Sequence, residues 1–141
     1  MTHVVELAQA LGLGRPDHPI GALQIVDALN RGLPIASLET VAGFVTNDAA
    51  FKYRIVSKAS LGRRRLTSLL SPQESERVAR VARIWVFAKE VWGSDNEARS
   101  FLCRPHPLLD DRCPIDVVVD SEMGAELVRD VLGRLQVGSA A

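Results

Sequence analysis

Apolar residues recur three and four positions apart along most of the 141-residue chain, and no segment alternates between apolar and polar positions for more than a few residues. Residues three and four apart share one face of an α-helix, whereas strict alternation is typical of a strand. The β-branched run at residues 117–119 is too short to indicate a strand. The pattern therefore predicts an all-α fold.

Glycines and prolines divide the first half of the chain into short predicted helices. Two of each fall within residues 12–19, where they end a first helix. Pro34 suits the first turn of a later helix. The helices predicted in this half cover about residues 3–11, 20–31, 34–43 and 49–56. In the second of them, Leu23, Val26 and Leu29 are expected to face the core.

The second half opens with a strong helix-start signal, Ser71-Pro72-Gln73-Glu74. Ser at the cap, Pro at the first helical position and Glu at the third satisfy free amides and complement the helix dipole, so a long helix is predicted from here to Gly93. Ser94-Asp95-Asn96-Glu97 is a second capping box. A short helix is predicted after Cys113-Pro114, and a last, longer helix over about residues 121–136.

The two longest predicted helices each carry an apolar face. On the first, Trp85 and Trp92 lie seven residues apart and are assigned to the core. The face of the last helix consists of Leu127, Val128, Val131, Leu132 and Leu135. Beyond it, residues 137–141 are expected to form a short tail of small residues.

Composition narrows the class of protein. With 47% hydrophobic and 24% charged residues, the chain is long enough for one ordinary core or two small helical subdomains. Residues 1–13 contain an acid and no basic run, so they do not resemble a signal peptide, and no apolar stretch approaches the roughly 20 residues of a membrane span. The two cysteines do not form the framework of a secreted disulfide-rich domain. We expect a cytoplasmic protein.

Candidate catalytic and metal-binding residues are few. Cys103, His106 and Cys113 offer three soft ligands, but a structural zinc site requires four with closer pairing, so no metal is expected. Cys113 is instead expected to replace a hydroxyl cap. No P-loop, Gly-rich dinucleotide motif or Ser/His/Asp arrangement occurs. We therefore predict neither a cofactor nor an enzymatic activity.

The zero net charge conceals an asymmetry between the two halves. Residues 1–70 contain eight Lys/Arg and five Asp/Glu, whereas residues 71–141 contain nine and twelve, so the halves carry +3 and −3. Six cations fall within fourteen residues that contain no acid: Lys52, Arg54, Lys58, Arg63, Arg64 and Arg65. The sequence therefore predicts a basic patch beside an acidic half, and two partners of opposite character.

The basic patch coincides with a predicted helix-turn-helix. After a break at residues 57–59, Ser60 is expected to cap a fifth helix that carries the arginines, and two short helices at this separation have helix-turn-helix spacing. Arg63 and Arg64 are long enough to reach guanine edges. The alternative is that the arginines and Lys58 form a solvated face or contact a partner protein.

A second arginine series, Arg77, Arg80 and Arg83, repeats every third residue of the long helix. With Glu74 and Glu76 nearby, the interpretation we favour is an exposed face of salt bridges. Contact with a partner protein is the alternative.

Several motifs, in order, resemble those of the Xre/MbcA/ParS-like antitoxins, which carry an Xre-like helix-turn-helix followed by a toxin-binding domain. They are Ser60-Leu61-Gly62-Arg63-Arg64, Leu70 to Arg77 with Arg80-Val81-Ala82-Arg83, Glu90-Val91-Trp92-Gly93, Ala98-Arg99-Ser100-Phe101-Leu102, Pro105-His106-Pro107, Arg112-Cys113-Pro114-Ile115-Asp116 and Leu132-Gly133-Arg134-Leu135. The resemblance covers residues 20–138. It implies an N-terminal arm over residues 1–19, a DNA-binding domain over 20–69 and a toxin-binding domain over 70–141.

The resemblance also implies partners. These are a toxin encoded beside the protein, typically a RES-domain enzyme that degrades or modifies NAD or a related ADP-ribosyltransferase, and the operator DNA, which such antitoxins bind as dimers to repress their own promoter. In such pairs the C-terminal domain covers the toxin and its tail blocks the entrance to the active site. The toxin-binding residues expected here are Arg77, Arg80, Arg83, Arg112, Arg134, Val137, Gly138, Ser139, Ala140 and Ala141.

The chain departs from the family pattern at four places. Relatives often end in Gly-Val-Tyr or Gly-Val-Phe, where this chain has Gly138-Ser139-Ala140, and two loop glycines are replaced by Asp110-Asp111. Cys113 stands where Ser or Thr usually caps, and Gly62 lies early in the expected recognition helix. The alternative function is a helix-turn-helix regulator whose C-terminal domain only dimerises.

Overall fold

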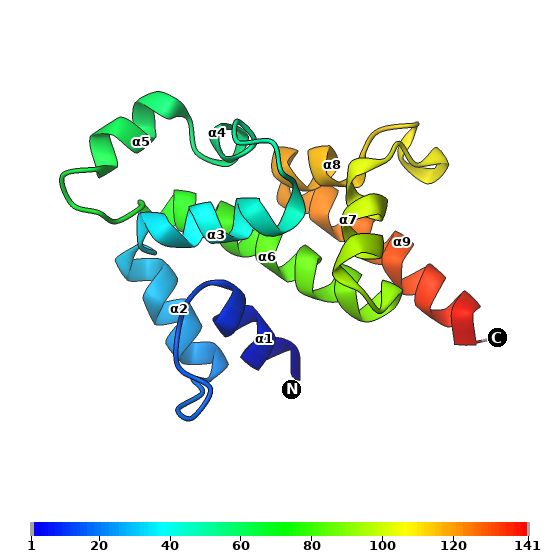
Figure 1. Ribbon diagram of the computed structural model, residues 1–141, viewed down its shortest axis with the longest axis horizontal. Helices are drawn as coiled ribbons and strands as arrows, with labels where there is room; N and C mark the ends of the chain where they lie inside the picture. Colours follow the sequence, from blue (N-terminus) through cyan, green and yellow to red (C-terminus); the bar gives the residue numbers. More distant parts are fainter. Residues whose placement is uncertain (1, 141) are drawn as a thin grey trace.

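The computed structural model describes residues 2–140, which form nine α-helices and one 3-10 turn (Figure 1). The helices are α1 Thr2–Ala10, α2 Ala22–Arg31, α3 Ile35–Val45, α4 Lys52–Ile55, α5 Lys58–Arg64, α6 Pro72–Trp92, α7 Asp95–Cys103, α8 Pro114–Asp120 and α9 Glu122–Ala140, with the 3-10 turn at Pro107–Leu109. Apart from isolated bridges, these residues form no β-strand. The all-α prediction is confirmed.

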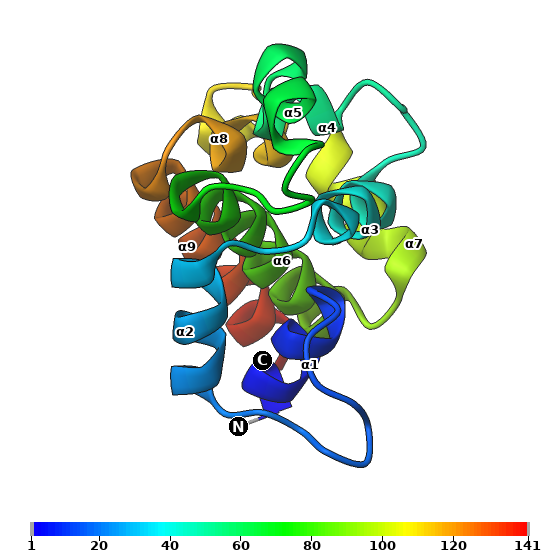
Figure 2. The same ribbon diagram turned by 90° about the vertical axis from the view of Figure 1, so that its left-hand side faces the viewer.

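Helix α6 is the centre of the molecule. It packs against α1, α2 and α3 from the first half of the chain and against α7, α8 and α9 from the second (Figure 2). A helix that is apolar around most of its circumference is stable only when neighbours cover it. Its buried residues include Val78, Ala79, Val81, Ala82, Ile84, Trp85, Val86 and Ala88. One core therefore runs through both halves, and the predicted boundary at residue 70 falls just before the helix that joins them.

The start of α6 has the predicted cap. The Ser71 side chain accepts a hydrogen bond from the amide of Glu74 at 3.1 Å, and the Glu74 carboxylate accepts one from the amide of Ser71 at 2.8 Å. Gly93 ends the helix in the left-handed conformation. At the start of α7, the Ser94 side chain accepts a hydrogen bond from the amide of Glu97. Among the described residues, this is the half of the expected second capping box that forms.

The core face predicted for α2 is wrong at Leu23 and Val26 and right at Leu29. In α2 the core face is Ile25, Ala28 and Leu29, while Leu23 is 78% and Val26 48% exposed. Helix α2 is apolar on two sides, and the position of α6 decides which side is buried. The face predicted for α9 is confirmed at Val128, Val131 and Leu132, whereas Leu127 is 49% exposed. In α6, Trp85 is buried as predicted, whereas Trp92 is 37% exposed.

The N-terminal arm belongs to the core. Helix α1 packs on α6 and α3, and Ala8, Ala10 and Leu11 are buried. The hydroxyl of Ser37, itself buried in α3, donates a hydrogen bond to the carbonyl of Leu11 at 2.6 Å. This bond satisfies a buried polar group where α1 ends, so the arm is fixed to the body by packing and by hydrogen bonding together.

The linkers α2–α3 and α5–α6 are joined by a backbone clasp. The amide of Leu70 donates to the carbonyl of Leu33 at 2.8 Å, and the amide of Ile35 donates to the carbonyl of Ser68 at 3.1 Å. Gly32 lies directly against this clasp with φ +101°. The clasp holds the start of α6 beside the end of α2.

Candidate functional site

The six cations of the predicted basic patch lie on α4, on α5 and in the loop that follows. Helix α5 contributes only Leu61 to the core, so most of its surface is exposed. Three of the cations contact carboxylates from other helices: the pairs are Lys52 with Glu39, Arg54 with Asp116 and Arg64 with Glu74. These three cations have carboxylate partners within the chain, which leaves less positive charge for a ligand than the sequence indicated.

The other three cations, Lys58, Arg63 and Arg65, are exposed and have no carboxylate within 4 Å in the described part of the chain. Arg63 donates to the Ser60 hydroxyl at 3.0 Å, and the Lys58 ammonium lies 5.3 Å from the centre of the Tyr53 ring. These contacts leave the charges unneutralised. The three cations form the free basic patch.

The cap of α5 differs from the prediction. Ser57 occupies the cap position, and its side chain accepts a hydrogen bond from the amide of Ser60 at 3.2 Å. Ser60, the predicted cap, therefore lies inside the helix. Its hydroxyl accepts from Arg63 instead, which is how a serine one turn into a helix supports a side chain on the following turn.

Arg64 has a structural partner in the buried carboxylate of Glu74, whose side chain is 5% exposed. Burial would raise the pKa of Glu74, but the hydrogen bonds from the Ser71 amide and the Arg64 guanidinium outweigh it and lower the pKa below its ordinary value of 4.5. The ionised carboxylate thus joins α5 to the start of α6.

Replacing Glu74 with glutamine is expected to lower the free energy of unfolding at pH 7 by about 1 to 2 kcal/mol, because the charged acceptor is lost. A carboxylate with a lowered pKa stabilises the fold above about pH 5, and this contribution is lost as the pH falls through the folded-state pKa. The difference between the parent and the variant should therefore shrink between pH 5 and pH 3. Urea unfolding at a series of pH values measures it, and a difference that stays constant over this range contradicts the assignment.

Two of the three α6 arginines form salt bridges as expected, but their partner is Glu122 and not Glu74 or Glu76. The Nε of Arg77 donates to the carbonyl of Ile55 in α4 at 2.9 Å. Side-chain length explains the difference, because an arginine on a central helix reaches the free carbonyls at the ends of neighbouring helices.

Arg80 and Arg83 connect α6 to α8 and α9. Arg80 is paired with Glu122 at 3.2 Å and donates to the last carbonyls of α8, and its side chain is only 15% exposed. Arg83 shares Glu122 at 3.3 Å. The Arg83 side chain is more accessible than that of Arg80, since 35% of it is exposed.

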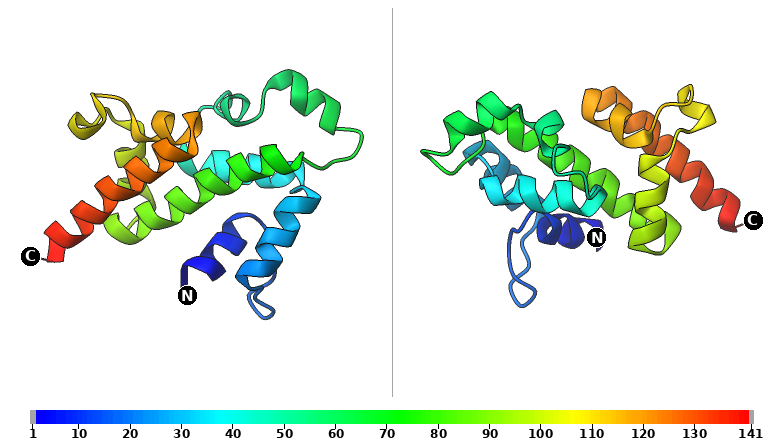
Figure 3. Two further views of the ribbon diagram at one scale, coloured as in Figure 1. Left: turned by 180° about the vertical axis from the view of Figure 1, so that it is seen from behind. Right: turned by 45° about the horizontal axis from the view of Figure 1, so that its top comes forward.

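The end of α9 corrects the prediction of a separate tail. The helix continues to Ala140, so residues 137–140 are helical, while Ala141 lies outside the described residues. Val137 is 71% exposed, and Gly138 is exposed too. Figure 3 shows this end of α9 projecting beyond the other helices, at the opposite end of the molecule from α5. Arg134 is exposed on the same helix.

The loop between α7 and α8 carries Arg112, which is exposed, and the two aspartates that replace glycines of the family pattern. Asp110 and Asp111 have φ of +53° and +60°. Aspartate tolerates this left-handed conformation better than other side chains with a Cβ, which explains the replacement.

The two cysteines lie near each other without forming a cap. Cys113 precedes α8 at the cap position, but its thiol donates to the carbonyl of Cys103 at 3.3 Å, so the expected hydroxyl-like cap is absent there. Burial raises the pKa of both thiols. Within the described residues no group of three or more His, Cys, Asp or Glu side chains is placed to hold a metal ion.

A groove that the sequence did not reveal lies along α9. Its inner part is a cavity of about 360 Å³ between α1, α6 and α9, lined by His3, Val4, Leu7, Arg83, Val86, Phe87 and Arg129. Phe87 and Arg129 also line a second hollow that continues to Val137 and Gly138. No motif marks these residues, because they come from three distant parts of the chain.

None of the described helices is long and apolar enough to span a membrane.

Comparison with known proteins matches a segment that contains the end of α9 and part of the groove lining. Residues 87–138 match the antitoxin Xre/MbcA/ParS C-terminal toxin-binding domain. The chain is also 30% identical over 118 residues to an antitoxin Xre from Yersinia enterocolitica, an alignment that covers 81% of this chain and 79% of that protein. The chain therefore belongs to the Xre/MbcA/ParS antitoxin family, and its C-terminal half carries the toxin-binding domain of that family.

Proposed function

We propose that this antitoxin neutralises an NAD-targeting toxin, either a RES-domain enzyme or a related ADP-ribosyltransferase, by covering the entrance to its active site with the end of α9. The observation that carries the proposal is the projecting last turn of α9, where Val137 is 71% exposed. An apolar side chain in such a position gains most from burial against a partner. The turn stands clear of the rest of the chain, so a toxin can enclose it.

The last turn of α9 lacks the aromatic residue with which relatives often end, so it would block an active-site entrance with smaller residues. Val137 supplies a small apolar contact, and Gly138 allows a close approach of backbone to backbone. A smaller plug requires additional contact area elsewhere on the C-terminal half. Arg134, one turn before Val137 and exposed, supplies a charge at the rim of the same surface.

The second part of the proposal is that the protein represses its own promoter through α4 and α5. The free basic patch of Lys58, Arg63 and Arg65 supports phosphate contacts, and Gly62 between them leaves open space on the exposed face of α5. A dimer would present two such patches to an operator with two half-sites. The patch and the end of α9 lie at opposite ends of the molecule, so DNA and toxin do not compete for one surface (Figure 1).

The charge distribution predicts a modest salt dependence for DNA binding. Three free cations predict a log–log slope of Kd against salt near 2.7 per protomer, whereas six would give about 5.4. Replacing both Lys58 and Arg63 with alanine should lower the slope by about 1.8 and weaken binding to the promoter fragment. Fluorescence anisotropy with the promoter fragment at about 50 to 200 mM salt measures both the Kd and its salt slope.

The matched control for this prediction is Arg31→Ala, which removes an exposed arginine from the end of α2. It should leave the slope unchanged. Promoter binding with the same slope in the Lys58/Arg63 double variant as in the parent protein would show that α5 is not the DNA-binding surface.

The test of toxin neutralisation is to express the gene adjacent to this one alone and together with it. We expect arrest of growth with the neighbour alone and recovery with both. If the neighbour is harmless alone, or arrests growth equally in both cases, the proposal fails and the alternative of a DNA-binding regulator that only dimerises is favoured.

A further inference from the structure

The groove beside α9 combines an apolar floor with positive charge. Phe87 and Val86 from α6 and Leu7 from α1 line its inner part, and Phe87 extends into the outer part that ends at Val137. A concave apolar surface of this kind binds a protruding side chain of a partner, since the side chain leaves water on several sides at once.

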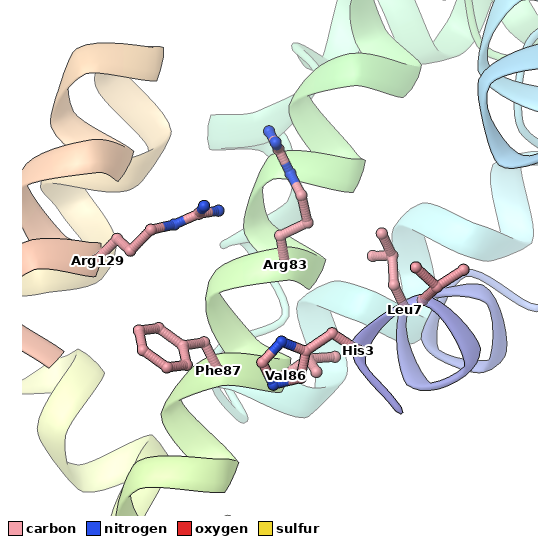
Figure 4. Close-up of a pocket in the computed structure, with 7 residues that line it drawn as sticks. His3, Leu7, Arg83, Val86, Phe87 and Arg129 are labelled. Atoms are coloured by element: carbon pink, nitrogen blue, oxygen red, sulfur yellow. The ribbon is translucent and has the colours of Figure 1, made fainter. Parts of the chain in front are cut away.

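Two arginines line this groove, and one of them, Arg129, points across it. Figure 4 shows the guanidinium of Arg129 reaching from α9 toward α6, and the side chain of Arg83 extending on the same side of the Phe87 ring. Arg83 shares its charge with Glu122, but Arg129 has no carboxylate within 4 Å among the described residues. A cation without a carboxylate partner, set beside an apolar surface, attracts an anionic group of a partner.

Helix α1 forms the second wall of the groove. The His3 ring is 2.5 Å from the Glu90 carboxylate and packs edge-on against Phe87, with ring centres 6.0 Å apart. Together with the packing of Ala8 and Leu11, this contact fixes the first turn of α1 beside α6. The family match begins at residue 87, so it assigns no role to α1.

We infer that this groove binds an acidic segment of the toxin, in which an aspartate or glutamate flanks a large apolar side chain, and that the N-terminal helix α1 is part of the toxin interface. The acidic group pairs with Arg129, and the apolar side chain lies on Phe87. The inference rests on the proposed neutralisation of a toxin and names the surface and the chemistry that hold it.

Continuity with the toxin-binding domain favours a toxin segment over other occupants. Phe87, Arg129 and Val137 all fall within the residues that match that domain, and the groove opens toward the exposed end of α9. A toxin that encloses the last turn of α9 therefore passes the mouth of the groove. Contacts there supply the additional area that a plug without an aromatic residue requires.

Photo-crosslinking tests whether α1 touches the toxin. p-Benzoylphenylalanine replaces His3, which lines the groove, and in a matched variant it replaces Gln9, which is exposed on α1 but does not line it. Each full-length variant is mixed with the purified product of the adjacent gene and irradiated. We expect a crosslink from position 3 only, to a toxin peptide that contains Asp or Glu beside an aromatic or aliphatic residue.

Binding measurements test the charge. Arg129→Glu should raise the Kd for the toxin at least about tenfold by calorimetry, because it places an acid against an acid, whereas Arg31→Glu should change the Kd less than about twofold. Val4→Glu on the α1 wall should also weaken binding, and Gln9→Glu should not. Thermal unfolding of each variant establishes that the fold is retained.

The inference is overturned if the toxin binds the parent protein but position 3 gives no crosslink and Arg129→Glu binds as tightly as Arg31→Glu. In that case neutralisation itself stands, and only the groove is excluded. A toxin that does not bind the parent protein at all contradicts the proposed function instead, so the two failures are distinguishable.

Discussion

Replacing Gly32 with alanine is expected to lower the free energy of unfolding by roughly 3 to 5 kcal/mol and the Tm by about 10 to 17 °C. Gly32 has φ +101°, a conformation that L side chains rarely adopt, and an added Cβ would lie 2.2 Å from the carbonyl oxygen of Leu70. That neighbour is backbone and part of the clasp, so it has no flexible end that can move aside. Differential scanning calorimetry or urea unfolding measures the loss.

The large effect follows from what the clasp holds in place. Buried Ser75 in α6 accepts a hydrogen bond from the amide of Leu33 at 2.8 Å, and the amide of Leu70 donates to the carbonyl of Leu33. A shift of Leu70 away from the new Cβ would break these bonds together and leave buried polar groups without partners.

The matched control is Gly62→Ala, because a Cβ at Gly62 would meet no atom within 4 Å and the residue lies inside α5. Alanine is a better helix former than glycine, so this variant should be more stable by about 0.5 to 1 kcal/mol. Equal effects of the two substitutions, in either direction, would contradict the role given to the clasp.

Deleting residues 137–141 is expected to abolish or strongly reduce protection against the toxin while leaving the Tm within about 2 °C of the parent protein. Val137 and Gly138 are exposed, so their loss removes little buried surface from the antitoxin itself. What is lost is the turn that we propose to cover the toxin. Growth of cells that express the toxin together with the truncated protein, and binding of the promoter fragment, are the two measurements.

Promoter binding should survive the deletion, because the free basic patch lies at the other end of the molecule. A matched point variant is Val137→Ala, compared with Val26→Ala on the exposed side of α2. Protection should fall only for the first. Parallel loss of protection and promoter binding would indicate general unfolding and remove the support for a plug at the end of α9.

Signals that depend on a few neighbouring residues predicted this fold well. The Ser71–Glu74 capping box and the Gly93 stop set the limits of α6 correctly because both act within one turn of the helix. The choice of a buried face was harder. Helix α2 is apolar at Leu23 and Val26 as well as at Ile25, and only the position of α6 determines which of them is buried.

The site could be predicted only in outline. The basic character of residues 52–65 was evident from the sequence, but the pairing of Arg54 with Asp116, 62 residues away, depends on how α4 and α8 meet. Likewise the groove brings His3, Phe87 and Arg129 together from three separate helices. The family motifs indicated which half binds the toxin, and packing across α6 determines the shape of the surface.

The proposed inhibition, in which the antitoxin covers an NAD-dependent active site, is tested by measuring NAD consumption by the purified product of the adjacent gene as this protein is added. We expect NAD consumption to fall to zero at a fixed stoichiometry and to return when residues 137–141 are deleted. Full NAD consumption in a saturated complex of the two proteins would contradict it.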